Sequence, residues 1–351
     1  MTDHFSRFFA AFETTETGRP SAPVPIPRPL RIGQDRPEKY IADKPLLAAA
    51  KAAVLLGKPL LLTGEPGTGK TQFASHLNWR LGFRQPAFEF ETKSYSAGRD
   101  LFYTYNSLAY FHASQIQDRT VRARDFISYN ALGEAILHTW EYAAASGFLP
   151  ADYARKWEAP HRSVVLIDEI DKAPRDFPND ILNEVERMRF SVPELGNETF
   201  QADRTIPPVL VLTSNSEKNM PDAFLRRCVY YHIPFPEKLT DPPEADPLER
   251  IVLARIDSFQ ERSSGLVREA IELFRDFRAA PGLEKKPATG ELLDWLLALV
   301  RLLEREAEIK GAALPDPKLK DVPNIAETLG ILFKTKEDLE RATRTVHSRP
   351  K

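Results

Sequence analysis

The chain has 351 residues, which is enough for two or three domains that share a large buried interior. Charged residues make up 28% and hydrophobic residues 42%, and the formal net charge of -2 gives no sign of a nucleic-acid partner. The single cysteine, Cys228, excludes an intramolecular disulfide and a cysteine-rich zinc site. Together with the lack of a signal-peptide or membrane-spanning pattern, it predicts a cytoplasmic protein.

The first two thirds of the chain alternate between helical and strand-like patterns. Residues 1–38 are predicted to form a flexible, proline-rich lead-in. Residues 40–57 place apolar side chains at helical spacing and end at a glycine, which predicts a helix. Short apolar runs at 59–63, 87–92, 163–167, 209–213 and 229–233 predict buried strands. The alternation predicts an α/β domain with a parallel sheet over residues 39–240.

The last third of the chain shows helical spacing throughout. Proline and acidic residues gather at 241–247, and this shift in composition predicts a domain boundary. Helices are predicted at 248–262, 266–278, 291–310, 325–333 and 336–346. Residues 241–351 are therefore expected to form a small all-helical domain.

A glycine-rich motif follows the first predicted strand. Residues 64–71 read GEPGTGKT and match G-x-x-x-x-G-K-[ST], between a strand and a helix as that pattern requires. Such a loop turns its backbone N–H groups toward nucleotide phosphates, while Lys70 neutralises the β and γ phosphates and Thr71 holds magnesium. The expected cofactors are ATP and Mg²⁺. The residues predicted to contact the nucleotide are Gly64, Glu65, Pro66, Gly67, Thr68, Gly69, Lys70, Thr71, Tyr40 and Ile41.

Two acids end the predicted strand at 163–167. Asp168 is predicted to hold the magnesium shell, and Glu169 to polarise a water molecule for attack on the γ phosphate, so the pair favours hydrolysis. The alternative is that both acids only cap the helix that follows. A calcium loop is excluded because Ala173 stands where such a loop needs glycine.

Asn215 follows the predicted strand at 209–213, at the same expected edge of the sheet as Glu169. An asparagine after a strand is usually a turn residue. Its place behind the two stronger motifs favours a catalytic role instead, in which the amide orients the attacking water and senses the γ phosphate.

The segments 64–71, 164–169, 213–215 and 221–227 occur in an order that resembles AAA+ ATPases, and among them the MoxR family. The resemblance covers about residues 38–345. It implies a P-loop sheet domain with two insertions, a helix-2 insertion within residues 96–160 and a pre-sensor-1 hairpin at 188–206, followed by a helical lid. Such insertions usually line or cap the pore of a ring.

The resemblance also assigns roles to two arginines. Arg226 and Arg227 would be presented to the ATP of the neighbouring subunit, with Arg227 the favoured arginine finger because it is the last basic residue before the next strand. The family also places an arginine at the start of a lid helix, and residues 286–294 contain none. Lys285 or Lys286 would have to replace it.

The implied function is ATP hydrolysis that drives remodelling or chaperone-like activation of a partner protein by a homo-oligomeric, hexameric ring. The family suggests a partner with a von Willebrand A domain. An alternative is a nucleic-acid-stimulated motor, which the near-zero charge and the acids of the predicted hairpin disfavour. A scaffold that only binds ATP is disfavoured because binding alone does not need Glu169, Asn215 and Arg227.

Overall fold

The structure is a computed structural model that describes residues 11–12, 24, 36–115, 121–150, 153, 159–216, 220–237, 246–256, 264–310 and 317–348. The chain divides into two compact units. Residues 42–234 form one, here termed the sheet unit, and residues 1–41 with 235–351 form the other, the helical unit. Most of the predicted lead-in lies outside the described residues, and so do residues 241–245 at the predicted boundary.

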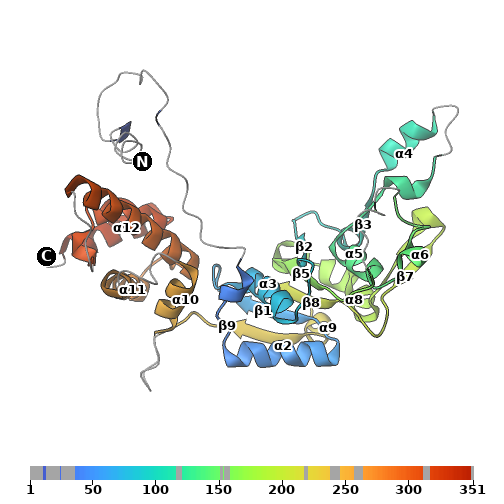
Figure 1. The fold of residues 1–351 in the computed structure, drawn as a ribbon, viewed down its shortest axis with the longest axis horizontal. Coiled ribbons are helices and arrows are strands. Elements are labelled where there is room, and N and C mark those ends of the chain that lie inside the picture. The colour runs from blue at the N-terminus through green and yellow to red at the C-terminus, as the bar shows by residue number, and fades with distance from the viewer. Residues whose placement is uncertain are drawn as a thin grey trace. The chain divides into compact units, whose positions relative to one another are not determined.

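A five-stranded parallel sheet organises the sheet unit (Figure 1). Its strands lie in the order β2 (Phe88–Glu91), β5 (Val164–Asp168), β8 (Val209–Thr213), β1 (Leu60–Gly64) and β9 (Val229–Ile233). Every residue of β1 and β8 is buried, whereas the edge strands β2 and β9 alternate between more and less buried positions. This pattern is that of a parallel sheet covered on both faces, so the predicted α/β fold is confirmed.

Helices pack on the sheet and set the positions of its loops. α2 (Lys44–Leu56) packs against β9 and β1, α3 (Lys70–Arg80) against β5, β1 and β8, and α5 (Ala131–Leu137) against β2 and β5. The predicted start of α2 at residue 40 is wrong. Asp43 caps the helix by accepting a hydrogen bond from the Leu46 N–H at 2.7 Å, and a proline occupies its first turn.

Two short antiparallel strand pairs extend the sheet unit. β3 (Tyr103–Tyr105) pairs with β4 (Ile127–Tyr129), and β6 (Arg189–Val192) pairs with β7 (Glu198–Gln201). The predicted hairpin at 188–206 is therefore present, and its aromatic residues belong to the same core as the sheet. The other elements of the unit are η2 (Gly98–Leu101), α4 (Ser107–Ser114), η3 (Ala123–Phe126), α6 (Tyr142–Ala145), η5 (Ile170–Lys172), α7 (Phe177–Asp180), α8 (Leu182–Arg187), η6 (Pro193–Leu195) and α9 (Asp222–Leu225).

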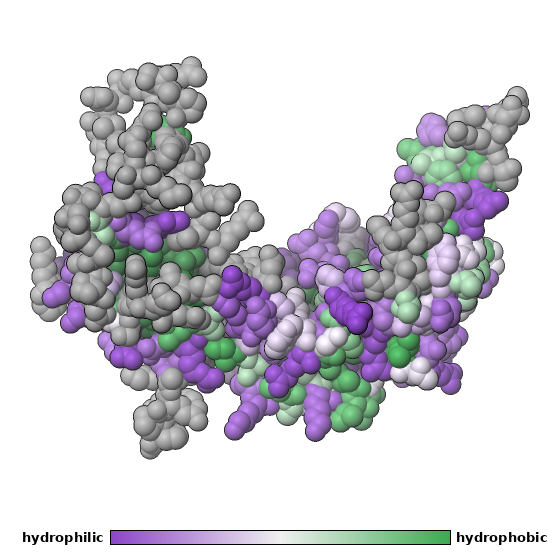
Figure 2. All heavy atoms as spheres, viewed as in Figure 1, coloured by the Kyte–Doolittle hydropathy of each residue, from purple (hydrophilic) through white to green (hydrophobic). Residues whose placement is uncertain are grey.

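Residues 96–160 form the longest excursion from the sheet, although residues 116–120, 151–152 and 154–158 of it lie outside the described residues. α4 lies at the tip of this excursion, away from the sheet (Figure 1). Figure 2 shows apolar side chains at its surface, where Leu108 and Phe111 are 66% and 59% exposed.

The helical unit consists of α10 (Pro247–Arg255), α11 (Ser264–Ala279), α12 (Thr289–Lys310), α13 (Lys336–Ser348) and the short turns η1 (Pro37–Lys39), η8 (Leu319–Asp321) and η9 (Ile325–Ile331). Trp295 is fully buried at its centre, where the indole N–H donates to the Thr328 hydroxyl at 2.7 Å. The predicted helix at 248–262 is too long, because Ile256 is already extended. The segment predicted as a helix at 325–333 is a 3-10 helix.

Within the described ranges, no helix is both long and apolar enough to span a membrane.

Candidate nucleotide site

The glycine-rich loop joins the end of β1 to the start of α3. Gly64 has a φ of 148°, and a Cβ at this position would lie 2.6 Å from the carbonyl oxygen of Ile233 on the neighbouring strand β9. Gly69 has a φ of 88° at the cap of α3. Only glycine combines these backbone angles with so close an approach. The loop can therefore direct its N–H groups toward a bound anion at the helix N-terminus.

Lys70 is buried at the base of the loop. Its ammonium group donates to the carbonyl oxygens of Gly64 at 2.9 Å and Glu65 at 3.0 Å, and to the side-chain oxygen of Asn215 at 2.9 Å. Burial lowers the pKa of Lys70, while the nearby carboxylates, Asp168 foremost, act in the opposite direction. The contact with Asn215 places the end of β8 beside the loop. The role of Asn215 as a phosphate-sensing amide stays a prediction.

Asp168 lies at the centre of a hydroxyl network. The Thr71 hydroxyl lies 3.0 and 3.2 Å from its two carboxylate oxygens, and the buried Thr213 hydroxyl donates to one of them. Hydroxyl and carboxylate oxygens are the donors that Mg²⁺ prefers, and a nucleotide-bound Mg²⁺ needs only one or two of them from the protein. Among the described residues, no three or more His, Cys, Asp or Glu side chains are grouped so that they could hold a metal ion.

Glu169 has a left-handed backbone conformation, with φ 55° and ψ 48°. This conformation is unfavourable for a residue with a side chain and occurs where the surroundings impose it. The Thr213 hydroxyl accepts a hydrogen bond from the Glu169 N–H at 2.8 Å, and the Glu169 carboxylate forms an ion pair with Lys172. The hydrogen bond that the Lys172 ammonium donates to the Glu169 carboxylate raises the pKa of Lys172. Glu169 makes no side-chain cap on η5, so capping is not what its carboxylate does here.

Sequence reasoning gave no role to three residues that hold this site together. Thr213 connects Asp168 with Glu169, Lys172 pairs with Glu169, and the Asp171 carboxylate accepts from the Asn215 N–H at 3.2 Å. One signal in the sequence could have indicated them, because polar residues that follow neighbouring parallel strands meet at the same edge of the sheet. What the sequence did not show is which polar atoms face each other across that edge.

The candidate arginines belong to a different part of the sheet unit, the junction of α9 and β9. The Arg227 guanidinium donates to the Glu186 carboxylate of α8 at 3.0 Å and to the Ala223 carbonyl at 3.0 Å. Its side chain is 42% exposed, and that of Glu186 is 55% exposed. Arg226 caps α9 and is exposed. Within the described residues, neither arginine bonds to the glycine-rich loop or to Asp168.

Four of the other residues that were predicted to contact the nucleotide lie in two places, two in the loop and two in the helical unit. Glu65 and Thr68 are bonded to each other within the loop, with the Thr68 hydroxyl 2.8 Å from the Glu65 carbonyl oxygen. Tyr40 and Ile41 belong to the helical unit, where the Arg255 guanidinium lies 5.9 Å from the centre of the Tyr40 ring. Their contact with a nucleotide stays a prediction.

The fold and this site define a class of protein. A parallel sheet whose carboxyl edge carries a glycine-rich loop, a buried lysine, a threonine and a strand-end aspartate is the architecture of a P-loop nucleotide hydrolase. The model of one family, the AAA domain (dynein-related subfamily), matches residues 59–228. Residues 59–228 thus form an AAA+ ATPase domain, and the protein is an ATPase.

Other known proteins add little to this assignment. No curated protein matches the chain in sequence. Solved structures of three Thermotoga maritima RuvB variants match at 14 to 15% identity, covering 86% of this chain and 70 to 71% of theirs, with TM-scores of 0.42 to 0.45. A Cytophaga hutchinsonii protein described as a candidate ATPase matches at 15% identity over 88% of this chain and 92% of its own, with a TM-score of 0.34. These TM-scores are too low to support a conclusion.

Proposed function

We propose that this ATPase works as a homo-oligomeric, MoxR-like ring, hexameric by family resemblance, that remodels or activates a partner protein. The observation that carries the proposal is the separation of Arg227 from its own glycine-rich loop. The loop region brings together Lys70, Thr71, Asp168, Glu169 and Asn215. Among the residues that the structure describes, the Arg227 guanidinium bonds to Glu186 and Ala223 and to none of these five. An arginine that stabilises the transferring phosphoryl group would then come from a neighbouring subunit.

The residues at the loop divide the chemistry between them. Thr71 and Asp168 would hold Mg²⁺, and Lys70 would neutralise the terminal phosphates. Bound Mg²⁺ supplies charge neutralisation on the phosphate oxygens. Glu169 accepts the proton of the attacking water, and Asn215, fixed by Asp171, orients that water.

The other parts of the proposal rest on composition and resemblance. The proposed domain limits are 39–240 and 241–351, with 1–38 as a lead-in. The division into compact units between residues 41 and 42 and between residues 234 and 235 lies within six residues of the limits at 39 and 240 and supports them, whereas residues 1–41 are grouped with the helical unit. The partner would carry a von Willebrand A domain, and the single cysteine suits a reducing, cytoplasmic compartment. A nucleic-acid track is disfavoured because the β6–β7 hairpin region carries Glu194, Glu198 and Asp203 against Arg189 and Arg204.

A subunit-mixing experiment tests the ring. Lys70→Ala and Arg227→Ala chains should each be inactive alone, because one cannot bind ATP and the other cannot complete its neighbour's site. In an equal mixture, about a quarter of the interfaces join an intact loop to an intact Arg227, so part of the activity should return. The measurement is phosphate release at protein concentrations above and below assembly.

Two outcomes would contradict the ring. One is a mixture that stays as inactive as its components although sizing shows mixed assemblies. The other is wild-type activity that remains linear down to concentrations at which only monomer is present, with Arg227→Ala already inactive there.

A further inference from the structure

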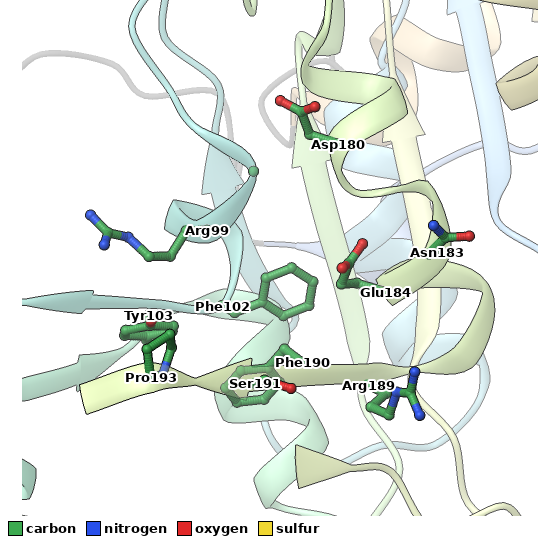
Figure 3. A pocket seen from close by; sticks show the side chains of 11 residues that line it. Arg99, Phe102, Tyr103, Asp180, Asn183, Glu184, Arg189, Phe190, Ser191 and Pro193 are labelled. Atoms are coloured by element: carbon green, nitrogen blue, oxygen red, sulfur yellow. The ribbon is translucent and has the colours of Figure 1, made fainter. Parts of the chain in front are cut away.

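A pocket of about 420 Å³ opens between η2, α7, α8 and β6 in the sheet unit (Figure 3). None of its lining residues is a predicted nucleotide contact. Its apolar part includes the rings of Phe102 and Phe190, which stack with centroids 5.1 Å apart. The polar part supplies both hydrogen-bond donors and acceptors. These polar side chains are Arg99, Asp180, Asn183, Glu184, Arg189 and Ser191.

The pocket lies along the edge of β6. Arg189, Phe190 and Ser191 are consecutive in this strand, and all three line the pocket. Successive side chains of a strand point to opposite faces of its sheet. Three consecutive residues can therefore line one pocket only if the pocket borders the edge of the strand.

The register of the hairpin shows which backbone groups point to that edge. The Met188 carbonyl accepts from the Ala202 N–H at 2.9 Å, and bonded pairs alternate along an antiparallel ladder. Phe190 is then the next residue bonded to β7, and it faces Phe200. The N–H and C=O groups of Arg189 and Ser191 point away from β7, toward the pocket edge.

The opposite edge of the hairpin provides a check on this register. Gln201 pairs with Arg189, so its carbonyl should point outward from β7. It does, because the Trp140 indole N–H donates to it at 2.7 Å. The outer edge of β7 is thus covered at this point, whereas in the described part of the chain no strand pairs with β6 on the pocket side.

We propose that β6 binds an extended segment of a partner polypeptide as an added strand, with the pocket receiving its side chains. The proposal rests on the proposed function, and it names the class of partner segment that the ATPase engages. An added strand presents alternating N–H and C=O groups that match those of Arg189 and Ser191. An apolar side chain of the segment would pack on the Phe102–Phe190 pair.

The charges around the pocket favour a polypeptide over other ligands. Arg99 and Arg189 balance Asp180 and Glu184, so the lining carries no net charge. A phosphate-rich ligand would meet two carboxylates, and a free cation would meet two guanidinium groups. A peptide strand, whose own main chain is uncharged, meets neither penalty.

Peptide selection followed by N-methyl scanning tests the proposal on the full wild-type chain. Random short peptides displayed on phage are selected without nucleotide, and the tightest binder is made with a fluorescein label for anisotropy. Two further versions carry N-methyl groups on the odd or on the even residues. Because only alternate amides of an added strand face β6, one version should lose at least about tenfold in affinity and the other should bind nearly as before.

Substitutions on the two strands locate the binding. Ser191→Pro removes the amide that points to the pocket edge without touching the ladder to β7, so it should reduce affinity at least about tenfold. Ser191→Ala, which keeps the amide, should bind as the wild type does. Thr199→Pro is the matched control, because Thr199 pairs with Ser191 and turns its own amide to the outer edge of β7.

Several results would overturn the proposal. These are the absence of any micromolar binder, an equal effect of both N-methyl versions, or unchanged binding by a folded Ser191→Pro. Loss of self-association in Ser191→Pro, with no peptide binder, would show instead that a second copy occupies β6. If Ser191→Pro does not fold, the N-methyl scan on the wild type decides. A chain that binds as expected but remodels nothing would contradict only the proposed function.

Discussion

The carboxyl edge of the central sheet and the α9–β9 junction each hold a cation, but they hold it in opposite ways. Lys70 is only 6% exposed and donates to two backbone carbonyls and one amide. Arg227 lies at the surface in an exposed pair with Glu186. Removing a partner from a buried charge is costly, whereas an exposed ion pair contributes about 0–1 kcal/mol. Lys70 is therefore fixed in place before any ligand arrives, while Arg227 can exchange its partner at little cost.

The largest effect on turnover is expected from a substitution of the exposed cation, Arg227. Arg227→Ala should reduce turnover of the assembled protein about a thousandfold or more, because an arginine finger stabilises charge that forms only in the transition state. ATP binding to the isolated subunit, measured with a fluorescent analogue, should be unchanged. Arg226→Ala serves as the neighbouring control and should have a much smaller effect. Equal effects of the two substitutions would remove the distinction between these arginines.

The next largest effect is expected from Glu169 and Lys70, which have different proposed roles at the carboxyl edge of the sheet. Glu169→Gln should bind ATP as the wild type does and hydrolyse it about a hundredfold more slowly, because the amide cannot take the proton of the attacking water. Lys70→Ala should instead lose ATP affinity, since phosphate charge is then left without compensation. Binding titrations and single-turnover rates separate the two. If both variants lost ATP binding equally, the role of Glu169 as the base would be wrong.

A smaller effect is expected from the hydroxyl that fixes Asp168 and Glu169. Thr213→Val keeps the shape of this fully buried side chain but leaves the Glu169 N–H without its acceptor. Urea unfolding should show a loss of about 1–3 kcal/mol in stability. Turnover should fall about tenfold because the backbone of Glu169 is no longer held in its left-handed conformation. Thr213→Ser retains the hydroxyl and should retain most activity; equal losses in both variants would point to packing instead.

The smallest effect probes the partner that Arg227 has in its own subunit. The Glu186 carboxylate competes with the phosphates of the neighbouring subunit for the Arg227 guanidinium. Glu186→Gln removes that charge, so turnover just above the assembly threshold should rise up to about fivefold. Added salt should raise wild-type activity relative to the variant, since salt screens the exposed pair. Rates measured from low to moderate salt check both points. A fall in turnover in Glu186→Gln would mean that Glu186 positions Arg227 for its task.

The sequence by itself determined the positions of the glycine-rich loop and of the core strands. Apolar runs bounded by turn residues located β1, β5, β8 and β9 to within a residue, because buried parallel strands admit few polar side chains. Their ends placed Asp168, Glu169 and Asn215 at a common edge before the strand order was known. Helix limits were less certain where a local cap decides them. Asp43 starts α2 four residues later than the apolar spacing indicated, and Ile256 ends α10 early.

Only the tertiary structure decided which polar atoms meet. The order β2-β5-β8-β1-β9 places Thr213 beside Asp168 and the end of β8 beside the loop that holds Lys70. These contacts join residues far apart in the chain, and no local spacing encodes them. The open edge of β6 depends likewise on hairpin register, which the turn and the packing of Phe190 and Phe200 fix together. The sequence pattern therefore indicates the chemistry that a polar residue can supply. Long-range packing determines which other residue it contacts.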